Sequence, residues 1–341
     1  MMEDSKKQRR SGFASVFEAK AIRNPFTSEY SIFCLTILYF IALTPFTPGL
    51  ASAENAANIF SNMLPLLIVA LGQTVVLITG GIDLSVTSTI ALSSVIGAMM
   101  MTGEQGLLGG SRWAAPAAVI AMLLAGAVIG LFNGAAITLF RMPAFIVTLT
   151  TMMFASGLAI WLTESKSIYN LPASFNSIGK GSLFIVPNAL IVAVLVALAL
   201  HVALTQTLFG RWLYATGHNA KAAEVSGVRV ERTVRLAYVI SGLCAATASI
   251  LYTGRMETGS PVLGQRILLD VIGASVIGGT SLFGGKGKVI WTISGVLFIT
   301  LTDNSLNMLG LSYFFIMMVK GAVILLAALL DAWRNRLFVR S

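Results

Sequence analysis

Long runs without a charged residue dominate this chain and limit the folds open to it. Seven runs contain no Asp, Glu, Lys or Arg, at residues 31–53, 55–82, 84–103, 113–140, 142–163, 181–210 and 236–254. A helix that crosses a bilayer needs roughly 20 mainly apolar residues, so each run has room for one. Only 11% of the residues are charged. Soluble domains carry about 25%, so most of the surface of this chain must face lipid.

The last third of the chain has shorter apolar runs, because charged residues interrupt it. Three helices still fit there, at about 267–283, 289–308 and 312–331. The runs are continuous rather than alternating, which excludes the strands of a β-barrel. In lipid, a helix satisfies its backbone hydrogen bonds within one segment. The sequence therefore predicts an all-α polytopic membrane protein with about ten transmembrane helices.

The positive charges indicate which segments lie in the cytoplasm. With the N-terminus inside, the cytoplasmic segments hold 17 of the 23 Lys and Arg residues and the opposite segments hold five. This excess is typical of cytoplasmic loops, so we expect both termini inside. The expected organisation is a cytoplasmic segment at 1–30, a transmembrane domain at 31–331 and a cytoplasmic tail at 332–341. The net charge of +9 then follows from topology, and no basic, aromatic-interleaved patch indicates nucleic-acid binding.

One polar segment, residues 205–235, lies between two of the apolar runs and carries five Lys and Arg residues. Asn219 is a suitable N-cap and Gly227 a suitable C-terminal stop, which predicts a helix of about two turns. Ala220, Ala223 and Gly227 fall near one face, where a partner backbone could approach closely. A helix this short is marginal in water, so the adjacent helices or a partner must hold it.

Segment 79–89 joins two apolar runs through Gly80-Gly81, followed by Asp83 and Ser85. Two compatible interpretations fit this pattern. Asp83 caps the start of the next helix, or the segment is a break in a helix that lines a translocation pathway. A charge deep in lipid costs roughly 2.5–3.5 kcal/mol on insertion scales, so Asp83 must face protein, water or headgroups.

Segment 277–288 is rich in glycine but is not a nucleotide-binding loop. A P-loop needs Gly five residues before its Gly-Lys pair and Ser or Thr after the Lys. Thr280 and Gly287 stand at these two positions around Lys286. We expect instead a tight, mobile turn at the cytoplasmic surface. Its pattern weakly echoes segment 79–89, as an internal repeat would.

The last three predicted helices contain polar and ionisable residues, which are functional candidates when they lie inside a membrane. Structural pairing of Lys320 with Asp303 or Asp270 is one interpretation, and contact with a substrate is another. A proton relay is less well supported, because no His or Glu chain accompanies these residues. The candidates for a translocation pathway or gate are Asp83, Ser85, Asp270, Asn304 and Asn307.

The sequence offers no catalytic or metal-binding group. Cys34 and Cys244 each lie inside an apolar run, where packing is the expected role. His201 and His218 are too far apart in the sequence to suggest a metal site. No Ser-His-Asp set or Cys-His pair occurs at workable spacing, so we do not expect an enzyme.

Four stretches together resemble the permease subunits of bacterial ABC importers of the ribose/xylose/galactoside type. They are GGIDLSV at 80–86, FGRWLYATGHNAKAAEVSGV at 209–228, LDVIGASVIGGTSLFGGKGKV at 269–289 and VKGAVILLAALLD at 319–331. The resemblance covers about residues 31–331. Thr87 and His218 depart from the family pattern, which has Gly at both positions.

The resemblance implies an ABC-importer permease fold and ATP-driven uptake of a monosaccharide or related polyol across the inner membrane. It implies a second permease subunit, a cytoplasmic ATPase that binds ATP and magnesium, a periplasmic sugar-binding protein and no cofactor in this chain. It also implies that a coupling helix docks into the ATPase, at Gly217, His218, Asn219, Ala220, Ala223 and Gly227. The alternatives are an ABC permease for another solute such as a nucleoside, an ion-gradient-driven secondary transporter, and a membrane enzyme or scaffold.

The polar segment at 164–183 falls on the outer side in this topology. Pro172 and Gly179 interrupt it, and Lys166 and Lys180 carry its positive charge. Two interpretations are equally open. The segment is part of the surface that receives the binding protein, or it is a plain solvated loop.

Overall fold

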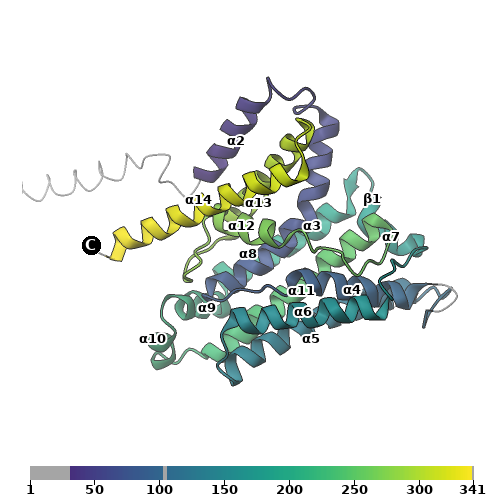
Figure 1. Ribbon diagram of the computed structural model, residues 1–341. Helices are drawn as coiled ribbons and strands as arrows, with labels where there is room; N and C mark the ends of the chain where they lie inside the picture. The colour runs from purple at the N-terminus through teal and green to yellow at the C-terminus, as the bar shows by residue number, and fades with distance from the viewer. Residues whose placement is uncertain (1–30, 103–105, 340–341) are drawn as a thin grey trace, which may run out of the picture.

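The protein folds into a bundle of helices that cross one another at an angle (Figure 1). Its structure, a computed structural model, describes residues 31–102 and 106–339. The predicted N-terminal segment at 1–30 lies outside the described residues. The predicted all-α class is confirmed, since the described strands amount to one short hairpin.

Six of the described helices are long and apolar enough to cross a bilayer. They are α3 (Ala53–Ile78), α5 (Ala114–Leu139), α6 (Ala144–Leu162), α8 (Asn188–Gln206), α11 (Val230–Met256) and α13 (Val289–Met308). Four more apolar helices are α2 (Ser31–Leu43), α4 (Val86–Met101), α12 (Leu268–Gly278) and α14 (Tyr313–Val339). The expected helical segments therefore all occur, but α12, with 11 residues, is shorter than a full span.

The core of the bundle is formed by α3 and α11, which pack against each other and against their neighbours. Small residues let α11 approach α5 closely. A Cβ on Gly126 would overlap the carbonyl oxygen of Gly242, and one on Gly130 would overlap that of Tyr238. This is the small-residue contact by which membrane helices commonly associate.

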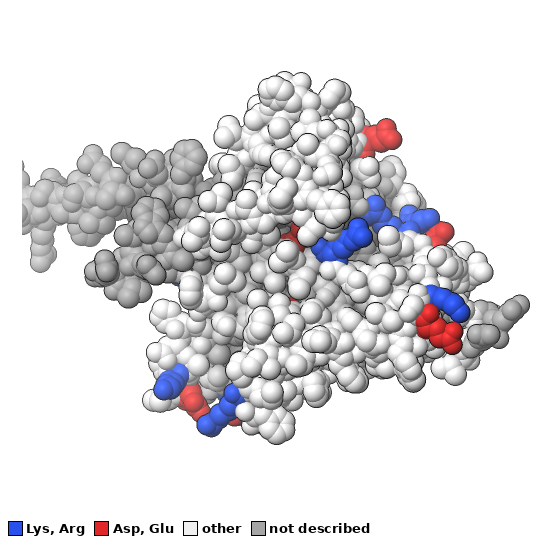
Figure 2. Space-filling model, viewed as in Figure 1, with Lys and Arg blue, Asp and Glu red and all other residues white. Residues whose placement is uncertain are grey.

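The outer helices turn large apolar side chains away from the core. Phe154 on α6 is 73% exposed and Leu195 on α8 is 61% exposed. Figure 2 shows that most of the visible face carries no charge, and that charged side chains appear at the lower left, along the right side and in one group near the centre. Such a surface suits lipid in the middle and water or headgroups at the ends.

The two ends of the bundle carry different structures. At one end lie α9 (Leu208–His218) and α10 (Ala220–Val225), on the same side as the start of α2 and the end of α14 (Figure 1). At the other lie α7 (Ala173–Lys180) and the hairpin of β1 (Ser182–Leu183) and β2 (Val186–Pro187). The expected orientation, with 205–235 and both termini in the cytoplasm, stays a prediction.

Two segments at the ends of helices take shapes that the sequence did not specify. The apolar run at 181–210 does not begin as a helix, because residues 182–187 pair as a hairpin with Leu183 opposite Val186. Helix α8 starts only at Asn188, whose N–H donates to the carbonyl oxygen of Gly181 at 2.9 Å. At the C-terminus, α14 continues to Val339 through most of the expected tail at 332–341.

Candidate functional site

The short helix predicted within 205–235 is present as α10. Asn219 is its N-cap and accepts a hydrogen bond at Oδ1 from the N–H of Ala222, at 3.0 Å. Gly227 follows the helix with a φ of 84°, a left-handed conformation that glycine adopts without steric cost. At about 1.5 Å per residue, its six residues make it slightly shorter than the two turns expected.

The exposed face of α10 differs from the one expected. Ala223 is only 5% exposed, because α10 packs on α9 and α11. The Ala223 side chain therefore packs within this chain. Ala220 and Gly227 are exposed, as is Val225, which is 91% exposed. Val225 is the apolar side chain that α10 presents to its surroundings.

Gly217, just before α10, is also an internal packing residue rather than part of an open docking face. A Cβ at Gly217 would overlap the carbonyl oxygen of Ile78, at the end of α3, and would lie 2.6 Å from the backbone nitrogen of Gly285. A Cβ at Gly284 would lie 2.7 Å from the carbonyl oxygen of Gly217 and 3.0 Å from the nitrogen of Gly80. We call these four residues, Gly80, Gly217, Gly284 and Gly285, the glycine junction.

Two hydrogen bonds stabilise the glycine junction and the turn that contains Gly284 and Gly285. The N–H of Gly285 donates to the carbonyl oxygen of Ile78 at 2.9 Å, and the Tyr214 hydroxyl donates to that of Gly287 at 2.6 Å. Burial raises the pKa of the Tyr214 phenol, so it remains a donor. Segment 277–288 thus forms the tight turn expected, and it packs beside the segment whose pattern it echoes. Its mobility stays a prediction.

Asp83 lies inside the bundle and is 1% exposed. Its Oδ1 accepts hydrogen bonds from the Ser85 N–H at 3.0 Å and the Ser85 hydroxyl at 2.6 Å, and its Oδ2 accepts one from Ser241 at 2.8 Å. Asn133 donates to the Ser85 oxygen at 2.8 Å, and Thr151 donates to Asn133 at 2.7 Å. Ser85 is the N-cap of α4, and Asp83 binds the N–H of this residue just ahead of the helix, so the capping role of Asp83 stays a prediction.

Side chains that the sequence analysis did not single out complete this network. With its amide oriented to satisfy both bonds, Gln73 donates to the Asp83 carbonyl at 3.0 Å and accepts from the Asp83 N–H at 3.2 Å. The Tyr238 hydroxyl donates to the carbonyl of Ile82 at 3.2 Å. The sequence signal that could have identified these side chains is an amide or hydroxyl group inside an apolar run, because a buried polar group needs a hydrogen-bond partner.

A second polar cluster joins the last three helices. Lys320 of α14 places Nζ 3.0 Å from Oδ1 of Asp270 on α12 and 2.9 Å from Oδ1 of Asp303 on α13. The side chains of Lys320 and Asp270 are 12% and 15% exposed, whereas that of Asp303 is 45% exposed. The structural pairing that we expected for Lys320 is confirmed, with both carboxylates as partners. We call these three residues the ion cluster.

The two asparagines among the pathway or gate candidates lie in different places. Asn307 donates to the carbonyl oxygen of Asp303 at 2.7 Å and is exposed. Asn304 instead pairs with Asn55 at the start of α3, through two reciprocal amide hydrogen bonds of 2.9 Å. Of the pathway candidates, Asp270 therefore belongs to the ion cluster and Asn307 is bonded to it. Asp83 and Ser85 belong instead to the hydrogen-bond network ahead of α4.

A cavity of about 180 Å³ opens beside the ion cluster, between α12, α13 and α14. Arg266 and Tyr313 also line it, and the Arg266 guanidinium lies 5.0 Å from the centre of the Tyr313 ring. The cavity combines charged, aromatic and aliphatic walls, which suits a small polar molecule.

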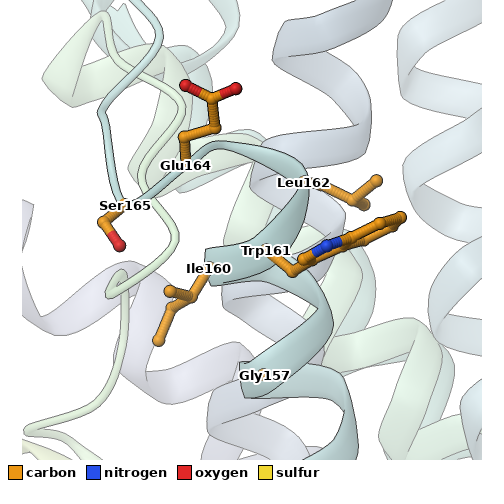
Figure 3. Close-up of a pocket in the computed structure, with 6 residues that line it drawn as sticks. All are labelled: Gly157, Ile160, Trp161, Leu162, Glu164 and Ser165. Carbon is orange, nitrogen blue, oxygen red and sulfur yellow. The ribbon is translucent and has the colours of Figure 1, made fainter.

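A wider hollow, of about 620 Å³, lies at the end of α6. In Figure 3, Ile160 and Ser165 point to one side of the segment and Trp161 and Leu162 to the other. Trp161 is 74% exposed. Because the polar groups do not converge, the hollow lacks the features of a ligand site.

Within residues 31–102 and 106–339, no three or more His, Cys, Asp or Glu side chains are placed to hold a metal ion. Both cysteines are free. Cys244 is buried, as expected for packing, whereas Cys34 on α2 is exposed.

Comparison with known proteins places this chain in a family. The family model described as "Branched-chain amino acid transport system / permease component" matches residues 55–328. The ribose import permease protein RbsC of Bacillus subtilis is 39% identical over 85% of this chain and 88% of its own length. The ribose import permease protein RbsC of Escherichia coli K12 is 35% identical over 89% of this chain and 93% of its own length. The D-allose transport system permease protein AlsC of the same organism is 30% identical over 89% of this chain and 90% of its own length.

No solved structure gives a significant match. The family model covers most of the chain, and the relatives align over nearly their whole lengths. The chain therefore belongs to this family of ABC transporter permease components and is a multi-pass membrane protein.

Proposed function

We propose that this chain is the permease of an ATP-driven importer that carries a monosaccharide or related polyol into a bacterial cell across the inner membrane. The names of its relatives support the substrate class, because they are import or transport permeases for ribose, D-allose and L-arabinose. The observation that carries the mechanism is α10, a short capped helix seated on the glycine junction at one end of the bundle.

The proposed topology has about ten spans, with both termini in the cytoplasm. Six long and four shorter apolar helices support this count. In this topology the end that carries α9 and α10 is cytoplasmic, and the end that carries α7 and the hairpin faces outward. The short helix α12 then crosses only part of the bilayer.

The proposed partners are a second permease subunit, a cytoplasmic ATPase that binds ATP and magnesium, and an outer sugar-binding protein. The ATPase contacts the exposed part of α10 and its flanks, at His218, Asn219, Ala220, Val225 and Gly227. The segment at 164–183 receives the binding protein. It is partly ordered, since α7 buries Phe175 and Ile168 pairs with Gly259.

Coupling follows from how α10 is attached. ATP binding closes the ATPase and moves α10, and the glycine junction transmits this movement to the end of α3 and to the turn before α13. The two states of the transporter must differ in their contacts with the ATPase, because otherwise ATP could not shift the equilibrium between them.

The proposed pathway residues divide into two groups. Asp270 lines the cavity between α12, α13 and α14, and Asn307 is bonded to Asp303, which also lines it; both are candidates for direct contact with sugar hydroxyls. Asp83 and Ser85 hold the break between α3 and α4 in shape and act on a gate from inside the bundle. Asn304 acts on the pathway through its pairing with Asn55.

The test is uptake by the purified complex in proteoliposomes, with the ATPase and binding protein present. ATP should drive accumulation of one of ribose, allose or arabinose, and omitting the ATPase should abolish it. Uptake by this chain alone under a proton or sodium gradient would instead identify a secondary transporter. A nucleoside and a branched-chain amino acid are tested as alternative substrates. The branched-chain amino acid is included because the family description names it. Transport of either one and of no sugar would overturn the proposed substrate class.

A further inference from the structure

A second apolar side chain is exposed at the α10 end of the molecule, on the turn between α12 and α13. Phe283 is 67% exposed, and its neighbour Leu282 is 36% exposed. On α10, Val225 is 91% exposed. Single exposed apolar residues are common, but here two elements far apart in the sequence present them at the same end of the bundle. Exposed apolar groups gathered in this way mark binding surfaces.

The turn that carries Phe283 has a fixed shape. The N–H of Phe283 donates to Oγ of Ser281 at 3.2 Å, and the N–H of Gly284 donates to the Ser281 carbonyl at 3.3 Å. The N–H of Ser281 donates to the carbonyl of Lys286 at 3.0 Å, which closes the turn. These bonds hold Phe283 at the tip of the turn.

The same turn is joined to the base of α10. A Cβ at Gly284, next to Phe283, would lie 2.7 Å from the carbonyl oxygen of Gly217. A Cβ at Gly285 would lie 3.2 Å from Cα of His218, one residue before the N-cap of α10. The two residues that follow Phe283 are therefore packed against the two residues that precede the N-cap of α10.

The position of Phe283 favours a protein partner over lipid. Lys286 and Lys288 follow within the same connection, and Lys221 and Glu224 lie on α10. Charged residues keep these segments out of the hydrocarbon region. An aromatic side chain at such a place meets water unless a protein covers it. Because the two connecting segments are basic, the surface that covers them should be acidic at its rim.

We infer that Phe283 and Val225 form one composite docking surface for the cytoplasmic ATPase, which receives both side chains in apolar pockets with an acidic rim. This inference rests on the proposed function and adds a second contact to it. Residues 226–229 connect α10 to α11, whereas Phe283 lies in the connection between α12 and α13. The ATPase therefore holds the helices on both sides of the glycine junction, including α12, which carries Asp270 of the ion cluster.

The test measures the affinity of the ATPase for this chain in nanodiscs, with Phe283→Ser, Phe283→Leu and Val225→Ser variants. Phe184→Ser is the matched control, because Phe184 is 93% exposed on the hairpin at the opposite end. We expect Phe283→Ser and Val225→Ser each to raise Kd about tenfold, the size of a modest interface hot spot. Phe283→Leu should keep most of the affinity, and Phe184→Ser should leave Kd unchanged.

A photo-crosslinking residue at position 283 identifies the occupant directly. A crosslink to the ATPase supports the inference. Crosslinks only to lipid, to a second copy or to the termini of this chain would overturn it, as would an unchanged Kd for Phe283→Ser. If Val225→Ser weakens binding and Phe283→Ser does not, the composite surface is wrong and the proposed function stands. If no ATPase binds the unmodified chain, the proposed function itself fails.

Discussion

Lys320 Nζ lies 3.0 Å from Oδ1 of Asp270, a residue 50 positions earlier in the chain. With the second contact to Asp303, this ion pair ties α14 to both α12 and α13. The Lys320 and Asp270 side chains are almost fully buried. A buried ion pair adds little stability compared with apolar residues, but losing one partner leaves an uncompensated charge.

We therefore expect Lys320→Met to destabilise the protein by about 3 kcal/mol, the low end of the range for a broken buried pair, because Asp303 is half exposed. Thermal unfolding in nanodiscs measures this effect. The triple variant Lys320→Met, Asp270→Asn, Asp303→Asn removes all three charges and should recover most of the lost stability. A Lys320→Met protein with an unchanged Tm would contradict a structural role for the ion cluster.

The pairing of Lys320 could be predicted from the sequence because a charge in an apolar helix must find an opposite charge. The ends of α10 could be predicted as well, because Asn219 caps the start of the helix and Gly227 follows its end, and both roles depend on local backbone geometry. The exposed face of α10 could not be predicted. Ala223 and Gly217 look like small residues left open for a partner, but tertiary packing turns both toward this chain.

The glycine junction also escaped prediction, although each of its segments was noticed. Gly80, Gly217 and the pair Gly284-Gly285 belong to three separate connections, and only the fold brings them together. The hairpin at 182–187 was missed for a related reason. Its strands are as apolar as the helix that follows, so no change in composition marks the boundary.

The glycine junction predicts a sharp difference between two glycine substitutions. Gly217→Ala places a Cβ against the carbonyl oxygen of Ile78 and should shift α9 relative to α3. We expect a lower Tm and a large loss of ATP-driven uptake. Gly157→Ala on α6 is the matched control, because no atom lies within 4 Å of its added Cβ. There, helix propensity predicts a gain of up to about 1 kcal/mol. Equal effects of the two substitutions would show that the junction is not tightly packed.

The Asp83 network predicts an effect of Ser241→Ala on stability. Ser241 donates to Oδ2 of Asp83 at 2.8 Å, from α11 across to the break before α4. Losing this buried, charge-assisted bond should cost about 1.5–3 kcal/mol in the free energy of unfolding. Ser294→Ala is the control, since Ser294 bonds only to the carbonyl of Ile290 in its own helix. If both variants unfold alike, Asp83 does not depend on Ser241.

Tyr214→Phe tests whether a movement of α9 is passed to the turn before α13 through a hydrogen bond. This substitution removes the hydroxyl that donates to Gly287 at 2.6 Å but keeps the ring in place. We expect about 1 kcal/mol of lost stability, the usual net worth of one hydrogen bond. In the assembled transporter, fewer sugar molecules should be carried for each ATP hydrolysed, because α9 can then move without the turn. The measurement is the ratio of uptake to ATP hydrolysis in proteoliposomes, with Tyr39→Phe as the control, because it removes a hydroxyl bonded to Ser305 at 2.9 Å and away from α9. A lower Tm with an unchanged ratio would leave Tyr214 as a packing residue only and would place the transmission of movement in the backbone contacts of the glycine junction.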